Sequence, residues 1–193
     1  HTTSLVFRDP PDHTRLSKLI APEFMPRPLA ALAPKIDSVV DHLLDHAEDI
    51  GEMDLITDLA GALPIEVVGD MLGVPLEDRG PLRGWSLAIL GALEPNISPE
   101  TLAIGNRAVE DFTEYLRSLI AHRRQHPNDD PSDILGDLIQ ALDGDDNISE
   151  YELLQNCIFL LNAGHETTTN LIGNGIACLL ENPGEMRRLR EES

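Results

Sequence analysis

Basic residues are scarce in this sequence, and their scarcity limits the partners that the protein can bind. Its 193 residues include 14 Lys and Arg against 34 Asp and Glu, which gives a formal net charge of −20. Proteins bind nucleic acid through clustered positive charge, so this balance argues against a nucleic-acid-binding protein. The same charge opposes adsorption to anionic membrane surfaces and favours a freely dissolved protein.

Long apolar runs and cysteines are also few. No apolar run reaches the about 20 residues that cross a bilayer, and no signal-peptide pattern is present. Cys157 and Cys178 would lie about 30 Å apart on one helix, so they cannot form a disulfide with each other. We expect two ordinary buried thiols and a reducing, cytoplasmic location with no membrane attachment.

The sequence is rich instead in helical patterns. Apolar residues recur at intervals of three and four over residues 29–49 and 99–126, which predicts two long helices with buried faces. Their expected core residues are Ile36, Val39, Val40, Leu43, Leu44, Ala47, Leu102, Val109, Phe112, Leu116, Leu119 and Ile120. Shorter helices are predicted over residues 11–20, 64–72, 132–142 and from 183 onward, with one short strand over residues 53–56.

Two regions have a simple structural interpretation. Glycines and a proline interrupt residues 76–93, which favours a loosely held helix there. Trp85 in this region is expected to be a packing residue. We predict no metal site, because residues 122–126 fit the positive end of a helix and the acidic turn at residues 143–147 lacks the late Glu of a calcium loop.

The longest helical pattern covers residues 149–181. Ser149 and Glu152 form the sequence signature of a capping box at its start. Asn182 and Pro183 end it. About 33 residues give a helix of roughly 50 Å, well above the average length in globular proteins. Because it is apolar on most sides, this helix is expected to cross the interior of the domain.

The middle of this helix, residues 163–168, reads Ala-Gly-His-Glu-Thr-Thr. Gly164 weakens a helix by about 1 kcal/mol relative to Ala, and the Thr167 hydroxyl can bend it by bonding to the carbonyl of Ala163. Glu166 is expected to be a buried carboxylate, which would need a partner, water or a proton. These residues predict a locally opened turn, although a kinked core helix with one satisfied acid is equally compatible. Position 169 is Thr, which excludes the zinc-protease pattern His-Glu-x-x-His.

This run resembles the oxygen-activation motif of the cytochrome P450 family, Ala/Gly-Gly-x-Asp/Glu-Thr-Thr/Ser, and matches every fixed position. Residues 9–16, Asp-Pro-Pro-Asp-His-Thr-Arg-Leu, and residues 72–75, Leu-Gly-Val-Pro, also resemble bacterial members of that family. The resemblance implies a mainly α, partial cytochrome P450 fold. That fold is built around one long central helix, which passes over the distal face of a heme.

The resemblance also implies roles for the central motif. Thr167 is then the hydroxyl that hydrogen-bonds the oxygen bound at the heme iron, and Glu166 is the acid that helps to pass protons inward. Ala163 and Gly164 lie against the heme.

Further roles come from the residues around the motif. Phe159 and Asn162, with Ala163, touch the substrate in this interpretation. Phe159, Ala163, Glu166 and Asn170 share one helix face, with Asn162 and Thr167 beside it.

The resemblance assigns roles to the first helix as well. His13 would hold a heme propionate, but Ser17 stands where the family has a second basic residue. Arg15 and Lys18 are expected to be exposed and to meet an acidic redox partner.

The family carries two further motifs in its second half, a Glu-x-x-Arg pair and a Phe-x-x-Gly-x-x-x-Cys-x-Gly loop, and the cysteine loop does not occur in the sequence. We therefore interpret residues 1–193 as the N-terminal and central part of a cytochrome P450 domain. The parent would be a heme b-dependent monooxygenase that inserts one atom of O2 into a small organic substrate, with electrons from a ferredoxin. The fragment alone is expected to be inactive and to bind heme weakly if at all. Apolar residues of the central helix, among them Leu160, Leu161, Leu171 and Ile172, would be uncovered in the fragment, which is therefore expected either to self-associate through them or to rearrange its helices over them.

Two other classes of function remain open at this point. The chain could be an all-α interaction module, which would explain the helices and the acidic surface. It could also bind an apolar ligand without chemistry. Both alternatives leave the glycine, acid and alcohol of the central turn without a role.

Overall fold

A computed structural model describes residues 3–126, 134–144 and 148–192 of the chain. The α-helices are α1 (Asp12–Ile20), α2 (Pro26–Ile50), α3 (Ala62–Met71), α4 (Leu82–Gly91), α5 (Pro99–Gln125), α6 (Ile134–Asp143), α7 (Glu150–Glu181) and α8 (Pro183–Glu192). A short helical turn at Leu5–Phe7 precedes α1, and others at Ala21–Phe24, Leu55–Ala60 and Leu76–Asp78 lie between the later helices. No strand occurs in the described ranges, so the predicted mainly α fold is confirmed.

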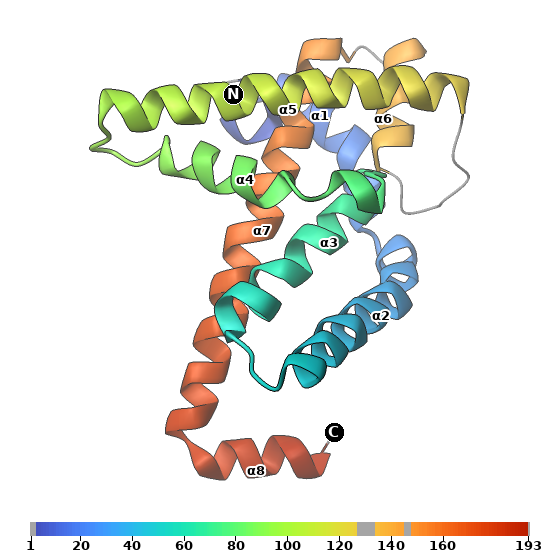
Figure 1. The fold of residues 1–193 in the computed structure, drawn as a ribbon. Helices are drawn as coiled ribbons and strands as arrows, with labels where there is room; N and C mark the ends of the chain where they lie inside the picture. Colours follow the sequence, from blue (N-terminus) through green and yellow to red (C-terminus); the bar gives the residue numbers. More distant parts are fainter. Residues whose placement is uncertain (1–2, 127–133, 145–147, 193) are drawn as a thin grey trace.

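The predicted central helix is α7, which passes behind α5 in Figure 1 and runs to the start of α8. The Ser149 hydroxyl accepts the backbone N–H of Glu152 at 3.2 Å, and the Glu152 carboxylate accepts the backbone N–H of Ser149 at 2.9 Å. This reciprocal pair is the predicted capping box. At the other end, the side-chain amide of Asn182 donates to the carbonyl of Cys178 at 2.8 Å, where α7 stops.

The hydrophobic core lies around the first half of α7. Leu153, Leu154, Ile158 and Leu161 of α7 have no exposed surface. They belong to one cluster with buried residues of α3, α4, α5 and α6. The Trp85 ring of α4 stacks on that of Phe112 at a centroid distance of 5.2 Å, so the predicted packing role of Trp85 is confirmed. This core fixes the first half of α7 against α3, α4 and α5.

The predicted strand at residues 53–56 is wrong. The side chain of Asp54 accepts the backbone N–H of Thr57 at 2.8 Å and starts the helical turn Leu55–Ala60. An Asp in this position satisfies a free N–H at the start of a turn, which favours a helical conformation over an extended one. A short apolar run does not distinguish these two conformations in sequence.

The predicted buried faces are only partly correct. In α2 only Leu32 is buried, and Leu44 is 45% exposed. Leu102 in the first turn of α5 is 44% exposed, whereas Phe112 and Leu116 further along are fully buried. Amphipathic spacing identifies the face that packs, but the depth of burial depends on whether another element covers that face.

The region from 76 to 93 contains a regular helix, α4, in place of an interrupted one. Gly80 and Pro81 lie before α4 and Gly91 is its last residue, so only Gly84 falls within the helix interior. The glycines and the proline therefore mark the ends of the helix. Ser132 and the turn residues 145–147 lie outside the described residues.

The second half of α7 has much less cover than the first. Leu171 and Leu180 are 72% and 68% exposed, and Cys178 is exposed as well. The expectation that both cysteines are buried is therefore wrong for Cys178, while Cys157 is buried in the core. Figure 1 shows this part of α7 running away from the core toward α8. Among the described residues, no helix is long and apolar enough to cross a membrane.

Candidate functional site

The Ala163–Thr168 motif lies where α7 leaves the core. The Thr167 hydroxyl donates to the carbonyl of Ala163 at 2.5 Å, which is the hydrogen bond predicted from the sequence. The Thr169 hydroxyl makes the equivalent bond to the carbonyl of His165 at 2.9 Å. The helix nevertheless continues through the motif, so the predicted opening of this turn does not occur. Hydroxyl bonds of this kind can bend a helix without breaking its own hydrogen bonds.

Gly164 has a steric function in this structure. A Cβ atom at this position would lie 2.6 Å from Cγ2 of Val68 on α3. The absence of a side chain thus allows α3 to pack directly against the backbone of α7. Close packing therefore explains the glycine, in place of the opened turn predicted from the sequence.

We expect Gly164→Ala to destabilise the protein. Val68 is β-branched and cannot easily rotate away, so the overpacking costs about 1–3 kcal/mol. This cost exceeds the gain of about 1 kcal/mol in helix propensity. Gly175→Ala is the matched control, because a Cβ atom added at Gly175 would meet no atom within 4 Å and only the gain should remain. Urea unfolding that showed equal stabilisation by both variants would contradict this explanation.

Glu166 and Thr167 are exposed, contrary to the expectation of a buried carboxylate. Successive residues on an α-helix are rotated by about 100°, so Glu166 points away from the contacts of Gly164 and His165. Thr167, three residues after Gly164, lies on the side of the helix that carries Ala163 and Gly164. Glu166 therefore needs no partner in the described part of the chain, and water can solvate its charge. Both groups remain accessible for chemistry.

His165 is the polar residue of the motif that enters the core. Its side chain is 2% exposed, and its Nδ1 atom lies 2.9 Å from the hydroxyl of Ser86 on α4. Burial lowers the pKa of His165 below its ordinary value, and the nearby charge of Arg83 lowers it further. The ring is therefore neutral near pH 7. The sequence assigned no role to this residue after the zinc-protease pattern was excluded, and only its partner on α4 distinguishes it from its neighbours.

The proposed substrate-contact residues differ in exposure. Phe159 is half-buried and Ala163 is exposed, whereas Asn162 is 6% exposed. Neither the side-chain nitrogen nor the oxygen of Asn162 has a hydrogen-bond partner among the described residues. A buried amide without partners is unfavourable, and water or a ligand usually forms the missing hydrogen bonds.

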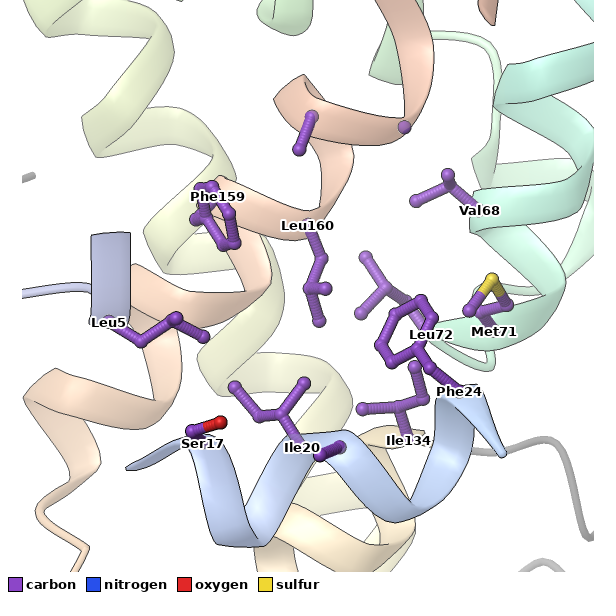
Figure 2. A pocket seen from close by; sticks show the side chains of 13 residues that line it. Leu5, Ser17, Ile20, Phe24, Val68, Met71, Leu72, Ile134, Phe159 and Leu160 are labelled. Atoms are coloured by element: carbon purple, nitrogen blue, oxygen red, sulfur yellow. The ribbon is translucent and has the colours of Figure 1, made fainter. Parts of the chain in front are cut away.

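A cavity of about 460 Å³ lies beside the motif, between α1, α3 and α7. Figure 2 shows Phe24, Leu160 and Ile20 among the labelled side chains around it. Its walls are almost entirely apolar, and Ser17 contributes a side-chain hydroxyl. The lining residues are Leu5, Ser17, Ile20, Ala21, Phe24, Val68, Met71, Leu72, Ile134, Phe159, Leu160, Ala163 and Gly164. The size and lining are typical of a site for an apolar small molecule or cofactor.

The cavity brings together some of the predicted residues and leaves others outside. Ala163, Gly164 and Phe159 line it, but Glu166, Thr167 and Asn162 do not. His13 does not line it either, although it lies one helical turn before Ser17 on the same side of α1. The structure thus places the apolar wall and the polar residues of α7 on adjacent faces of one helix.

Arg15 is not the free surface cation expected from the sequence. Its guanidinium pairs with the carboxylates of Glu152 and, at 3.3 Å, of Asp12. Burial raises the pKa of Glu152, but hydrogen bonds from Arg15 and Ser149 outweigh it and lower the pKa overall. Arg15 therefore joins α1 to the start of α7, and Lys18 remains exposed.

Within the described ranges, neither a metal centre nor a cysteine is found beside the cavity. Groups of three or more His, Cys, Asp or Glu that could hold a metal ion do not occur in the described residues. The rings of His122 and His126 stack on each other at 4.5 Å at the end of α5, as in an ordinary helix terminus. Cys157 and Cys178 are not among the residues described as lining the cavity.

Comparison with known proteins identifies the family. The sequence profile of the cytochrome P450 family matches residues 93–193. Cytochrome P450 CYP107DY1 of Priestia megaterium is 39% identical over 183 residues, which are 95% of this chain and 43% of that protein. The vitamin D(3) 25-hydroxylase of Pseudonocardia autotrophica is 36% identical over 192 residues, which are 99% of this chain and 45% of that protein.

Solved structures agree with the sequence matches. The crystal structure of P450BioI, in complex with an acyl carrier protein ligated to hexadec-9Z-enoic acid, superposes with a TM-score of 0.89 and 36% identity. The match covers 98% of this chain and 48% of that one. The chain thus spans less than half the length of these relatives, and it shares their fold throughout the part that it covers. The chain belongs to the cytochrome P450 family.

Proposed function

We propose that the complete protein is a heme-dependent monooxygenase that inserts one oxygen atom from O2 into a small organic substrate. The observation that carries this proposal is the position of Glu166 and Thr167. Both are exposed on α7, next to the apolar cavity that Ala163 and Gly164 help to line. Family membership gives no support to an interaction module or a binding protein without chemistry.

The cavity residues fit a heme. The apolar walls suit a large flat apolar ring, and Ala163 and Gly164 present almost no side chain that would obstruct its face. Ser17 and, one turn earlier on α1, His13 would face its polar edge and bind a propionate. When bound, heme b supplies the iron that binds and activates O2. No cysteine lines the cavity among the described residues, so this part of the chain supplies no thiolate ligand.

Glu166 and Thr167 would then handle protons. Glu166 is exposed and ionisable, so its carboxyl group can take a proton from water and release it toward the cavity. The Thr167 hydroxyl donates to the carbonyl of Ala163 in this structure. Its oxygen can also accept a hydrogen bond from protonated Glu166, so the hydroxyl can relay a proton when its own O–H turns from the Ala163 carbonyl toward the cavity. These roles need two adjacent polar groups on the accessible face of one helix.

The partners follow from the same proposal. A ferredoxin-type protein would supply the electrons, and Lys18 on α1 is an exposed cation that such an acidic partner could contact. The strongly acidic composition and the reducing conditions favoured by the cysteine pattern support a cytoplasmic location.

A carbon monoxide difference spectrum tests the proposed function. The complete protein, reduced and treated with carbon monoxide, is expected to show the spectrum of a thiolate-ligated heme. Residues 1–193 mixed with hemin should lack that spectrum, because no cysteine lines the cavity in the part of the chain that the structure describes. The oligomeric state of this chain should be measured in the same samples, since its exposed Leu171 and Leu180 favour self-association. A stable thiolate-type spectrum from the isolated chain would overturn the cavity assignment.

We expect Asn162 and Phe159 to influence substrate choice. Asn162→Ala removes a buried amide that has no partner among the described residues, so folding should lose little and the affinity for polar substrates should fall. Phe159→Ala enlarges the cavity and should favour bulkier apolar substrates. Spectral titration with a substrate panel measures both effects. Leu171→Ala, on the exposed part of α7, is the control and should not alter the ranking. Uniform affinities together with lost stability would show that both residues only pack the core.

A further inference from the structure

The hydrogen bond between His165 and Ser86 is the starting point for a further inference. The two side chains are 2% and 0% exposed, and they join the middle of α7 to the middle of α4. Buried polar groups of this kind are retained only when they are paired. His165 is also the immediate neighbour of Glu166, the residue to which we assign proton transfer.

The surroundings of the motif show what this bond can do. Gly164 packs against Val68 of α3, and His165 bonds to Ser86 of α4. Figure 1 shows α3 and α4 next to α7, and both helices contact it. Glu166 and Thr167 have no comparable contact in the described structure and are exposed. The orientation of these two reactive side chains therefore depends on the contacts of the two preceding residues.

The two contacts restrain α7 in different ways. The contact between Gly164 and Val68 is apolar, so it limits how closely α3 and α7 approach but sets no direction. A hydrogen bond weakens steeply when its angle changes, so the bond from His165 also fixes the rotation of α7 about its axis. Such a restraint matters here, because the hydroxyl bonds of Thr167 and Thr169 tend to bend the helix at this turn.

We propose that His165 is a positioning residue. Its hydrogen bond to Ser86 fixes the position and rotation of the turn with Glu166 and Thr167 relative to α4. This inference rests on the proposed function for its effect on the reaction. Its structural part, a bond that couples α4 to the motif of α7, stands by itself. The neutral state of the ring suits this role, because a charged ring would be costly in a buried interface.

Amide substitutions at position 165 test the role of one ring atom. The side-chain amide of Asn reaches the position of Nδ1, the atom that bonds to Ser86, whereas that of Gln reaches the position of Nε2. His165→Asn should therefore keep the bond and His165→Gln should lose it. Ser86→Ala removes the partner with the loss of a single oxygen atom, so this variant should fold. The double variant His165→Asn with Ser86→Ala completes the set.

Two measurements on the complete, heme-loaded protein test the proposal. The first is hydrogen exchange of the amides at residues 86–90 and 165–169. The second is kcat, KM and the product formed per O2 consumed. Ser86→Ala and His165→Gln should speed exchange in both segments by about fivefold. The loss of one typical hydrogen bond changes the equilibrium constant for local opening by about this factor. They should lower kcat by a similar factor and leave KM within about twofold, because neither residue lines the cavity.

The expected result is that His165→Asn resembles the wild type, and that this rescue disappears when Ser86 is Ala. Equal exchange in His165→Asn and His165→Gln would overturn the proposal, as would wild-type exchange in Ser86→Ala. Changed exchange in both segments with unchanged product per O2 would instead contradict the roles of Glu166 and Thr167. The failure of this inference and the failure of the proposed function are thus distinguishable.

Discussion

Glu166→Gln in the complete, heme-loaded protein is expected to slow product formation by about 100- to 10,000-fold, the usual contribution of a positioned proton donor. Glutamine keeps the shape of the side chain but cannot take up or release a proton. The hydrogen bonds around the motif do not involve the Glu166 side chain in the described structure, so the fold should be unaffected. Steady-state turnover and thermal unfolding of the same variant measure the two effects separately.

Thr167→Ala is the companion variant and should behave differently. We expect O2 consumption to continue while most of it yields peroxide, because the hydroxyl that relays the proton is missing. Thr169→Ala is a matched control, since its hydroxyl makes the same kind of bond to a carbonyl four residues earlier, on another side of the helix. Coupling of O2 uptake to product that stayed unchanged in Thr167→Ala would refute the role assigned to this residue.

Arg79→Met is expected to cause the largest loss of stability that the structure predicts, about 2–4 kcal/mol. The Arg79 side chain is 8% exposed. It donates to the carbonyl of Val74 at 3.0 Å, to the carboxylate of Glu66 at 2.7 Å and to that of Asp70 at 2.5 Å. Methionine preserves the apolar stem but leaves both carboxylates and the carbonyl without this donor.

The size of this effect follows from the partial burial of the two acids. The side chains of Glu66 and Asp70 are 30% and 24% exposed, so water can solvate them in part after the substitution. Arg188→Met is the control, because Arg188 is 64% exposed and its pairs with Glu185 and Glu192 lie on the surface of α8. Such pairs contribute at most about 1 kcal/mol. Urea unfolding that showed equal losses for both variants would show that Arg79 has no special structural role.

The partners of Arg79 determine how the chain approaches α4. In sequence it is one arginine in an acidic chain, between a turn and a proline. In the structure its three partners come from α3 and from the loop after it, and the bonds fix the approach of the chain to α4. These partners lie 5, 9 and 13 residues away. Spacing alone does not indicate which of several nearby acids the side chain reaches.

Local signals in the sequence determined the central helix and its motif. The capping residues Ser149 and Glu152 and the stop at Asn182 act over three or four residues, so their effect could be predicted and the boundaries of α7 agree with it. The hydroxyl bond of Thr167 to Ala163 is likewise local. The motif and the order of its neighbouring segments were enough to indicate the family.

Packing between segments that are distant in the sequence sets which sides of the helices are covered, and the sequence did not predict it. The sequence predicted a buried carboxylate at Glu166 and an opened turn at Gly164, whereas Glu166 is exposed and Gly164 accommodates Val68. The bond between His165 and Ser86 joins residues 79 positions apart, and the pairing of Arg15 with Glu152 spans 137 positions. Helical periodicity determines which residues share a face, because it is set by the backbone. The partner of that face is set by packing between distant segments, and the sequence carries no local signal for it.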